Sequence, residues 1–171
     1  MIGLKKLCML FAILFASNNF ILAENYGYSG MSKFNVHIDL SALVFIFGGT
    51  FSATVNLERH LISSRSGKTN LYARGGLGYA GALVVGSGAA SGDIGNGGLG
   101  ALTLLTGSNK HHLELVCGAF MGISNNNARS KDTFILPVVD VGYRYQKPGT
   151  SFIFRSKLGF LGLGIGLGYA F

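Results

Sequence analysis

The segment that decides the fold closes the chain and reads Leu161-Gly162-Leu163-Gly164-Ile165-Gly166-Leu167-Gly168-Tyr169-Ala170-Phe171. Every odd-numbered position carries a large apolar side chain, and every even-numbered position carries glycine or alanine. Successive side chains of a β-strand point to opposite faces, whereas a helix would scatter the large residues around its circumference. A helix would also lose about 1 kcal/mol at each glycine. The segment is therefore predicted as a strand with one apolar face and one closely packed face.

The same two-residue period recurs earlier in the chain, and in each case the second face is polar. The segments concerned are 34–42, 53–61, 71–80, 112–121, 139–146 and 152–158. The stretch 98–106 lacks a clean alternation, and counting it as a strand gives eight strands. Eight strands of about 9–11 residues, apolar outward and polar inward, are typical of the smallest outer-membrane barrels. We therefore predict an all-β fold, an eight-stranded antiparallel up-and-down transmembrane β-barrel.

Charged residues support a membrane barrel over a soluble one, which would turn its apolar face inward. Eight of them fall on the polar face of the predicted strands: Asp39, Glu58, Arg74, Glu114, Asp140, Arg144, Arg155 and Lys157. The four acids and four bases of this set sum to zero, as expected for a narrow lumen in which buried charges must be paired. An eight-stranded interior is only wide enough to be filled by side chains. We therefore expect a closed, salt-bridged lumen.

Composition agrees with a lipid-facing surface. Of the 171 residues, 49% are hydrophobic and only 12% are charged, whereas about a quarter of the residues of a soluble domain are charged. The net charge is +7, but the basic residues are scattered and do not cluster with aromatics, so nucleic-acid binding is not expected.

The N-terminus has the pattern of an export signal. Lys5 and Lys6 precede the apolar segment 7–16, and Ile21-Leu22-Ala23 fits a cleavage site. We expect a signal peptide over 1–23, an N-terminal lead over 24–32 and the barrel over 33–171. A retained anchor is the alternative at this end. A helical membrane protein is the alternative elsewhere, because 40–57 is uncharged, but Gly48-Gly49-Thr50 reads as a turn joining two strands.

An even strand number puts both barrel ends on the periplasmic side. The turns at 62–69, 107–110 and 147–150 are then periplasmic, and the longer links 84–97 and 123–133 face outward. Six apolar-face aromatics lie at periplasmic strand ends, where they would form an interfacial girdle. They are Tyr143, Tyr145, Phe152, Phe154, Tyr169 and Phe171.

With its final strand ending Gly168-Tyr169-Ala170-Phe171, the chain resembles the OmpA/OmpX-type eight-stranded bacterial outer-membrane proteins, including members with no assigned function. The resemblance covers residues 33–171. It implies that the C-terminal strand is read by the barrel-assembly machinery. The link around 158–162 is much shorter than the outer loops of that family.

The expected role is structural or a surface interaction, in a monomer contacting outer-membrane lipids, with the extracellular partner left open. Two alternatives remain: a narrow channel or a binder or transporter of hydrophobic small molecules, and a lipid-modifying barrel enzyme. We predict no catalytic, cofactor-binding or metal-binding residues. The glycine motif at 76–81 lies inside a predicted strand, and His111 and His112 point to opposite faces.

Overall fold

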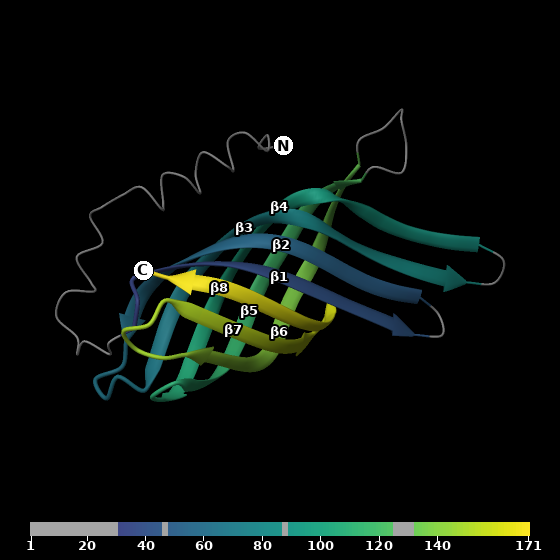
Figure 1. Cartoon of the computed structure of the whole chain (residues 1–171). Helices are drawn as coiled ribbons and strands as arrows, with labels where there is room; N and C mark the ends of the chain where they lie inside the picture. The colour runs from purple at the N-terminus through teal and green to yellow at the C-terminus, as the bar shows by residue number, and fades with distance from the viewer. Residues whose placement is uncertain (1–30, 46–47, 87–88, 125–131) are drawn as a thin grey trace.

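The alternating segments form a closed antiparallel barrel. The structure, a computed structural model, describes residues 31–45, 48–86, 89–124 and 132–171. Its strands are β1 (Phe34–Phe45), β2 (Gly48–Ser63), β3 (Thr69–Gly86), β4 (Ala89–Ser108), β5 (His111–Ser124), β6 (Thr133–Gln146), β7 (Phe152–Gly159) and β8 (Gly162–Ala170). Each strand pairs with its neighbours in the chain, and β1 also pairs with β8 (Figure 1). The predicted eight-stranded up-and-down barrel is confirmed. The predicted signal peptide lies outside the described residues.

The two faces of each strand differ as the alternation predicts. In β8, Leu163, Ile165 and Leu167 are all more than half exposed on the outer surface, whereas the glycines between them face the interior. In β1, Asn35, His37 and Asp39 are buried inside the barrel while the intervening apolar residues face out. The barrel therefore carries its apolar side chains outside and many of its polar side chains inside.

Three of the predicted links are wrong in extent. The predicted loop over 84–97 is mostly strand, because β3 and β4 remain paired up to Gly86 and Ala89. Its small residues still form a regular ladder, since backbone pairing does not require large side chains. The predicted turn Gly48-Gly49-Thr50 belongs to β2, so residues 46–47 connect the first two strands. The link predicted over 123–133 is shorter, because Ser124 ends β5 and Thr133 begins β6.

The barrel wall is uneven at the end opposite the C-terminus, where β7 and β8 stop short of the other strands (Figure 1). Residues 133–139 of β6 pair with β5, while among the described residues β7 pairs only with 140–146. The Val139 carbonyl accepts a hydrogen bond from Phe160 N at 3.1 Å, so residue 139 directs its backbone groups away from β5. Pro137, two residues away, directs its nitrogen to the same side, where β7 does not pair with it. Proline lacks an N–H and is tolerated there, where it also discourages pairing with another chain.

Among the described residues, no helix is long and apolar enough to cross a membrane.

Candidate functional site: the ionic layer of the lumen

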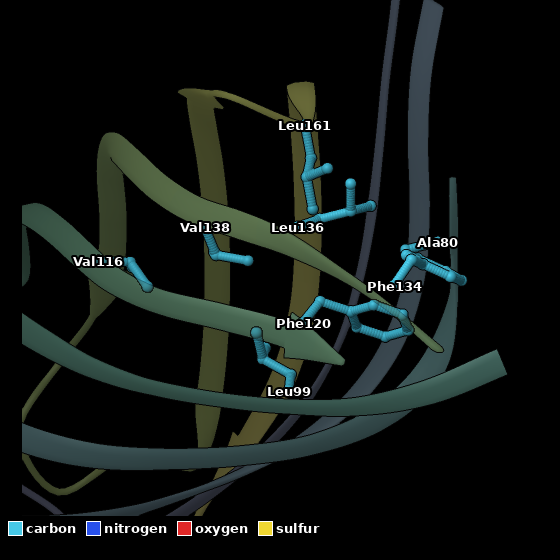
Figure 2. Close-up of a cluster of buried hydrophobic side chains, with 8 residues drawn as sticks. All are labelled: Ala80, Leu99, Val116, Phe120, Phe134, Leu136, Val138 and Leu161. Atoms are coloured by element: carbon cyan, nitrogen blue, oxygen red, sulfur yellow. The ribbon is translucent and has the colours of Figure 1, made fainter. Parts of the chain in front are cut away.

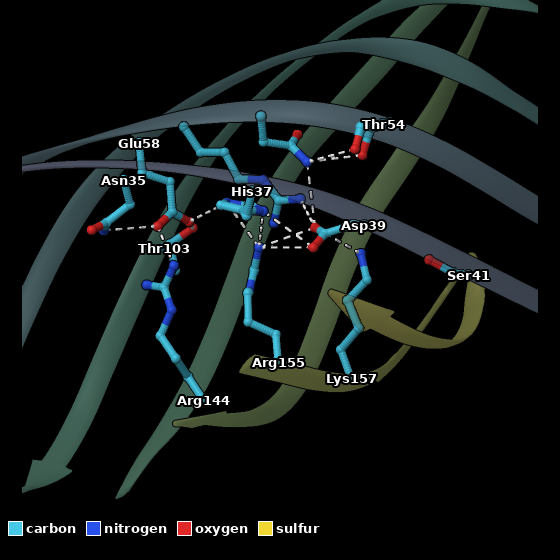
Figure 3. A network of polar contacts seen from close by, with 12 residues as sticks. Asn35, His37, Asp39, Ser41, Thr54, Glu58, Thr103, Arg144, Arg155 and Lys157 are labelled. Carbon is cyan, nitrogen blue, oxygen red and sulfur yellow. Dashed lines mark hydrogen bonds and ion pairs between the residues drawn. The ribbon is translucent and has the colours of Figure 1, made fainter. Parts of the chain in front are cut away.

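The most distinctive site is a layer of charged side chains across the middle of the lumen (Figure 3). Six strands supply it: β1, β2 and β3 on one side, β5 and β6 on the other, and β7, which contributes two bases. Its members are the eight charged residues expected there from the sequence: Asp39, Glu58, Arg74, Glu114, Asp140, Arg144, Arg155 and Lys157. None is more than 9% exposed. Charges buried to this extent are tolerated only when paired and hydrogen-bonded.

Arg155 is the centre of the layer. Its Nε donates to Glu114 Oε2 at 3.0 Å, and Nη2 pairs with the other oxygen of the same carboxylate. Its Nη1 lies 3.0 Å from Asp39 Oδ2 and 2.7 Å from His37 Nδ1. This guanidinium therefore ties β7 to β5 through a two-pronged contact, the geometry in which arginine binds carboxylates most strongly, and ties β7 to β1 through Nη1.

The remaining charges extend the layer into one connected network. Arg74 pairs with Asp39, and Arg144 pairs with Glu58. The Nε of Arg144 also forms an ion pair with Glu114 at 3.4 Å, which joins the two halves. Lys157 Nζ lies 3.1 Å from Asp140 Oδ2 and 3.7 Å from Asp39 Oδ2. All eight charges are thus linked, and the lumen is crossed by ion pairs in several directions.

The glycines of β8 make room for this layer. A Cβ at Gly166 would overlap the Asp39 carboxylate, and one at Gly164 would lie 2.9 Å from Lys157 Cε. A Cβ at Gly168 would lie 2.5 Å from the Cβ of His37. The closely packed face expected for β8 is therefore the surface against which the charged side chains of β1 and β7 rest.

Apolar side chains close the lumen on both sides of the ionic layer. At the end where the C-terminus lies, Met31, Tyr72 and Leu105 form a small buried cluster. At the opposite end a larger cluster contains Ala80, Leu99, Val116, Phe120, Phe134, Leu136, Val138 and Leu161 (Figure 2). The Phe134 ring lies against Gly122, whose missing side chain leaves space for it. The ions are therefore enclosed between two apolar plugs.

Sequence reasoning missed two parts of this interior. His37 lies between two carboxylates, 3.1 Å from Asp39 Oδ1 and 3.3 Å from Glu58 Oε1. Its position on the polar face of β1 was visible, but its partners on β2 and β7 depend on strand register. The larger apolar cluster was also indicated in the sequence, because Val116 and Phe120 are apolar residues on the otherwise polar face of β5.

The predicted aromatic girdle lies on three adjacent strands and forms an arc. Tyr143, Phe152, Tyr169 and Phe171 are exposed, while Tyr145 and Phe154 are half-buried. Phe34 stacks on Phe171 at 6.1 Å, and His111 packs against Tyr143 at 5.8 Å, measured between ring centroids. These two contacts extend the arc from β5 round to β1 at the end where the C-terminus lies.

A serine and a histidine meet near this end, which bears on the lipid-modifying alternative. Ser63 Oγ lies 2.9 Å from His60 Nε2 and donates to Asn70 Oδ1 at 2.7 Å. With its hydroxyl proton directed to the asparagine, the serine does not donate that proton to the histidine in this arrangement. A general base needs the opposite arrangement, with the serine donating to the histidine. The contact ties β2 to β3 at the turn between them.

The other motifs occupy structural positions. The glycines of 76–81 lie within β3, and the turn predicted over 62–69 is formed by residues 64–68 between β2 and β3. His111 is exposed and His112 is buried, on opposite faces of β5. Across the described part of the chain, no three His, Cys, Asp or Glu side chains are grouped to hold a metal ion. The chain matches no protein-family model and no curated protein sequence.

Proposed function

We propose that the chain is an integral outer-membrane β-barrel with a closed, salt-bridged lumen and a structural or surface-interaction role. The observation that carries the proposal is the exposed apolar surface that surrounds the barrel. Every strand contributes to it, through Ile38, Val55, Leu77, Leu102, Leu115, Val139, Leu158 and Ile165 in turn. Soluble monomers rarely expose apolar patches above a few hundred Å², whereas a bilayer requires such a band around the whole circumference.

The interior favours a sealed barrel over the channel alternative. An open channel needs a continuous water-filled path, but the lumen holds a paired ionic layer between two apolar clusters. Three of the four connections at the end opposite the C-terminus are two residues long. Surface recognition would then rest mainly on residues 125–132. A structural, membrane-anchored role follows most directly from so compact an outer end.

Export and assembly complete the proposal. The predicted signal peptide would direct the chain across the inner membrane, and the C-terminal strand, with exposed Tyr169 and Phe171, would engage the barrel-assembly machinery. The barrel would contact outer-membrane lipids as a monomer.

Expression of the full chain in a bacterium with two membranes tests this location. We expect the protein in the outer-membrane fraction, with a folded form whose gel mobility changes on boiling. Replacing Phe171 with aspartate should lower the folded fraction several-fold, while Phe160→Asp, at the opposite end, serves as the control. Recovery of the wild-type chain in the cytosol would contradict the proposal.

Solute flux tests the closed lumen. Vesicles that contain the folded barrel should retain small ions as well as empty vesicles do, because the ionic layer and both apolar clusters fill the interior. Insertion is established in the same vesicles by protease resistance of the barrel. A large, steady conductance through the inserted wild-type protein would support the channel alternative instead.

A further inference from the structure

An apolar groove of about 800 Å³ crosses the outer face of β6, β7, β8, β1 and β2. Its two walls are rows of outward side chains that follow the strand register. One row runs from Tyr143 on β6 to Ala53 on β2, and the other runs from Val141 to Phe51. The residues between the rows point into the lumen, so they offer the groove only their backbone. The groove thus runs without interruption along the outer surface, and it is lined almost entirely by apolar atoms.

Small residues give the groove its depth. Ala42, Ala53 and Ser156 stand in the walls where neighbouring positions carry leucine, isoleucine or phenylalanine. Gly142 and Gly164 lie along the floor. The groove crosses four strand spacings of about 4.8 Å each, which makes it about 19 Å long. Because the strands of such barrels tilt by about 35–45°, the groove rises obliquely and spans about 12 Å of membrane depth, close to one leaflet.

The part of the groove nearest the end of the barrel that holds the C-terminus carries polar and cationic groups. The Tyr143 hydroxyl lies 2.6 Å from His111 Nδ1. Lys110 precedes this histidine, and its carbonyl accepts from the amide of Gln146 at 3.0 Å, which places Lys110 beside the turn that begins at Lys147. Both lysines are exposed. The acidic residues of the described strands lie in the lumen or towards the opposite end, so this corner is electropositive.

We propose that the groove and this corner together bind an anionic phospholipid. The phosphate lies against Lys110, Lys147 and the His111–Tyr143 pair, and one acyl chain follows the groove between its two walls. Charge complementarity selects the headgroup, since lysines near a membrane surface attract anionic lipids. The length and apolar lining of the groove select the chain. This inference rests on the proposed membrane location, because only a membrane-embedded barrel meets such a lipid in this orientation.

Native mass spectrometry of the folded full-length protein, released from vesicles of equal phosphatidylglycerol and phosphatidylcholine, tests the site. The wild type should retain phosphatidylglycerol about tenfold more often than phosphatidylcholine. The double variant Lys110→Gln/Lys147→Gln should bind the two lipids about equally. The groove-filling variant Ala42→Leu/Ala53→Leu should lose most of its retained lipid of both kinds.

Two matched controls separate the site from general effects. Lys33→Gln/Lys68→Gln removes the same charge from exposed positions away from the groove, and Ala73→Leu/Ala119→Leu adds the same bulk to other outward positions. Both controls should behave as the wild type. Equal retention of the two lipids by the wild type, or equal losses in the controls, would overturn the inference. A chain that fails to insert into vesicles would refute the membrane proposal, whereas one that inserts without lipid preference refutes this site alone.

Discussion

Replacing Arg155 with methionine is expected to destabilise the folded barrel by about 3–5 kcal/mol. The substitution keeps most of the side-chain volume but removes the cation that contacts Glu114, Asp39 and His37. Asp39 retains Arg74 and Lys157, while Glu114 keeps only the 3.4 Å ion pair with Arg144. The cost therefore arises mainly from a buried carboxylate that has lost its two-pronged partner. Urea unfolding of the barrel in lipid vesicles measures the change.

The double variant Arg155→Met/Glu114→Met distinguishes an ionic effect from a packing effect. Removing both members of a buried pair leaves no uncompensated charge, and such replacements are often close to neutral. We therefore expect the double variant to be more stable than Arg155→Met alone. Arg65→Met, at an exposed turn position, should change stability by less than about 0.5 kcal/mol. A double variant less stable than the single variant would contradict the ionic explanation.

Replacing Gly166 with alanine is expected to destabilise the barrel by about 2–4 kcal/mol. The added methyl group would occupy the space of the Asp39 carboxylate, which Arg74, Arg155 and Lys157 hold in place. The carboxylate can move only by breaking these ion pairs. The substitution therefore acts on the ionic layer from β8, a strand that contributes no charge of its own.

Gly98→Ala is the matched control for this change, because a Cβ at Gly98 would meet only ordinary contacts at 3.7 Å and beyond. Alanine in a strand interior is favoured over glycine by about 0.5–1 kcal/mol, so this variant should be as stable as the wild type or slightly more stable. Equilibrium unfolding of both variants in the same vesicles makes the comparison. Equal stability of the two variants would show that the β8 glycines are not required for packing.

The alternation of side chains was sufficient to predict the barrel because the period of two is a local property. The terminal strand shows this most clearly, since its leucines face out and its glycines face in along its whole length. The charged positions could be assigned to the interior for the same reason. Their partners could not, because which base meets Asp39 depends on the register of β1 against β8 and of β8 against β7.

The stretch 84–97 was misassigned because glycine, serine and alanine carry no periodic signal and are weak strand formers. There the ladder is continued by pairing between β3 and β4, which the sequence does not reveal. At Pro137 the residue type agrees with the structure. Proline is disfavoured in a central strand, and it lies where β6 has no pairing with β7. The full membership of the apolar cluster around Phe120 could not be predicted from the sequence, because its members come from several strands and a turn that only the fold brings together.

Depth-dependent fluorescence quenching tests the central claim, that the outer face of the barrel contacts lipid acyl chains. The chain contains no tryptophan, so a single introduced tryptophan reports one position. Val55→Trp, Leu77→Trp, Leu115→Trp and Leu167→Trp place the reporter around the circumference, and Lys68→Trp places it at a turn. The four outward positions should give blue-shifted emission that brominated acyl chains quench, and the turn position should not. Water-like emission without quenching at the four outward positions would contradict a membrane-embedded barrel.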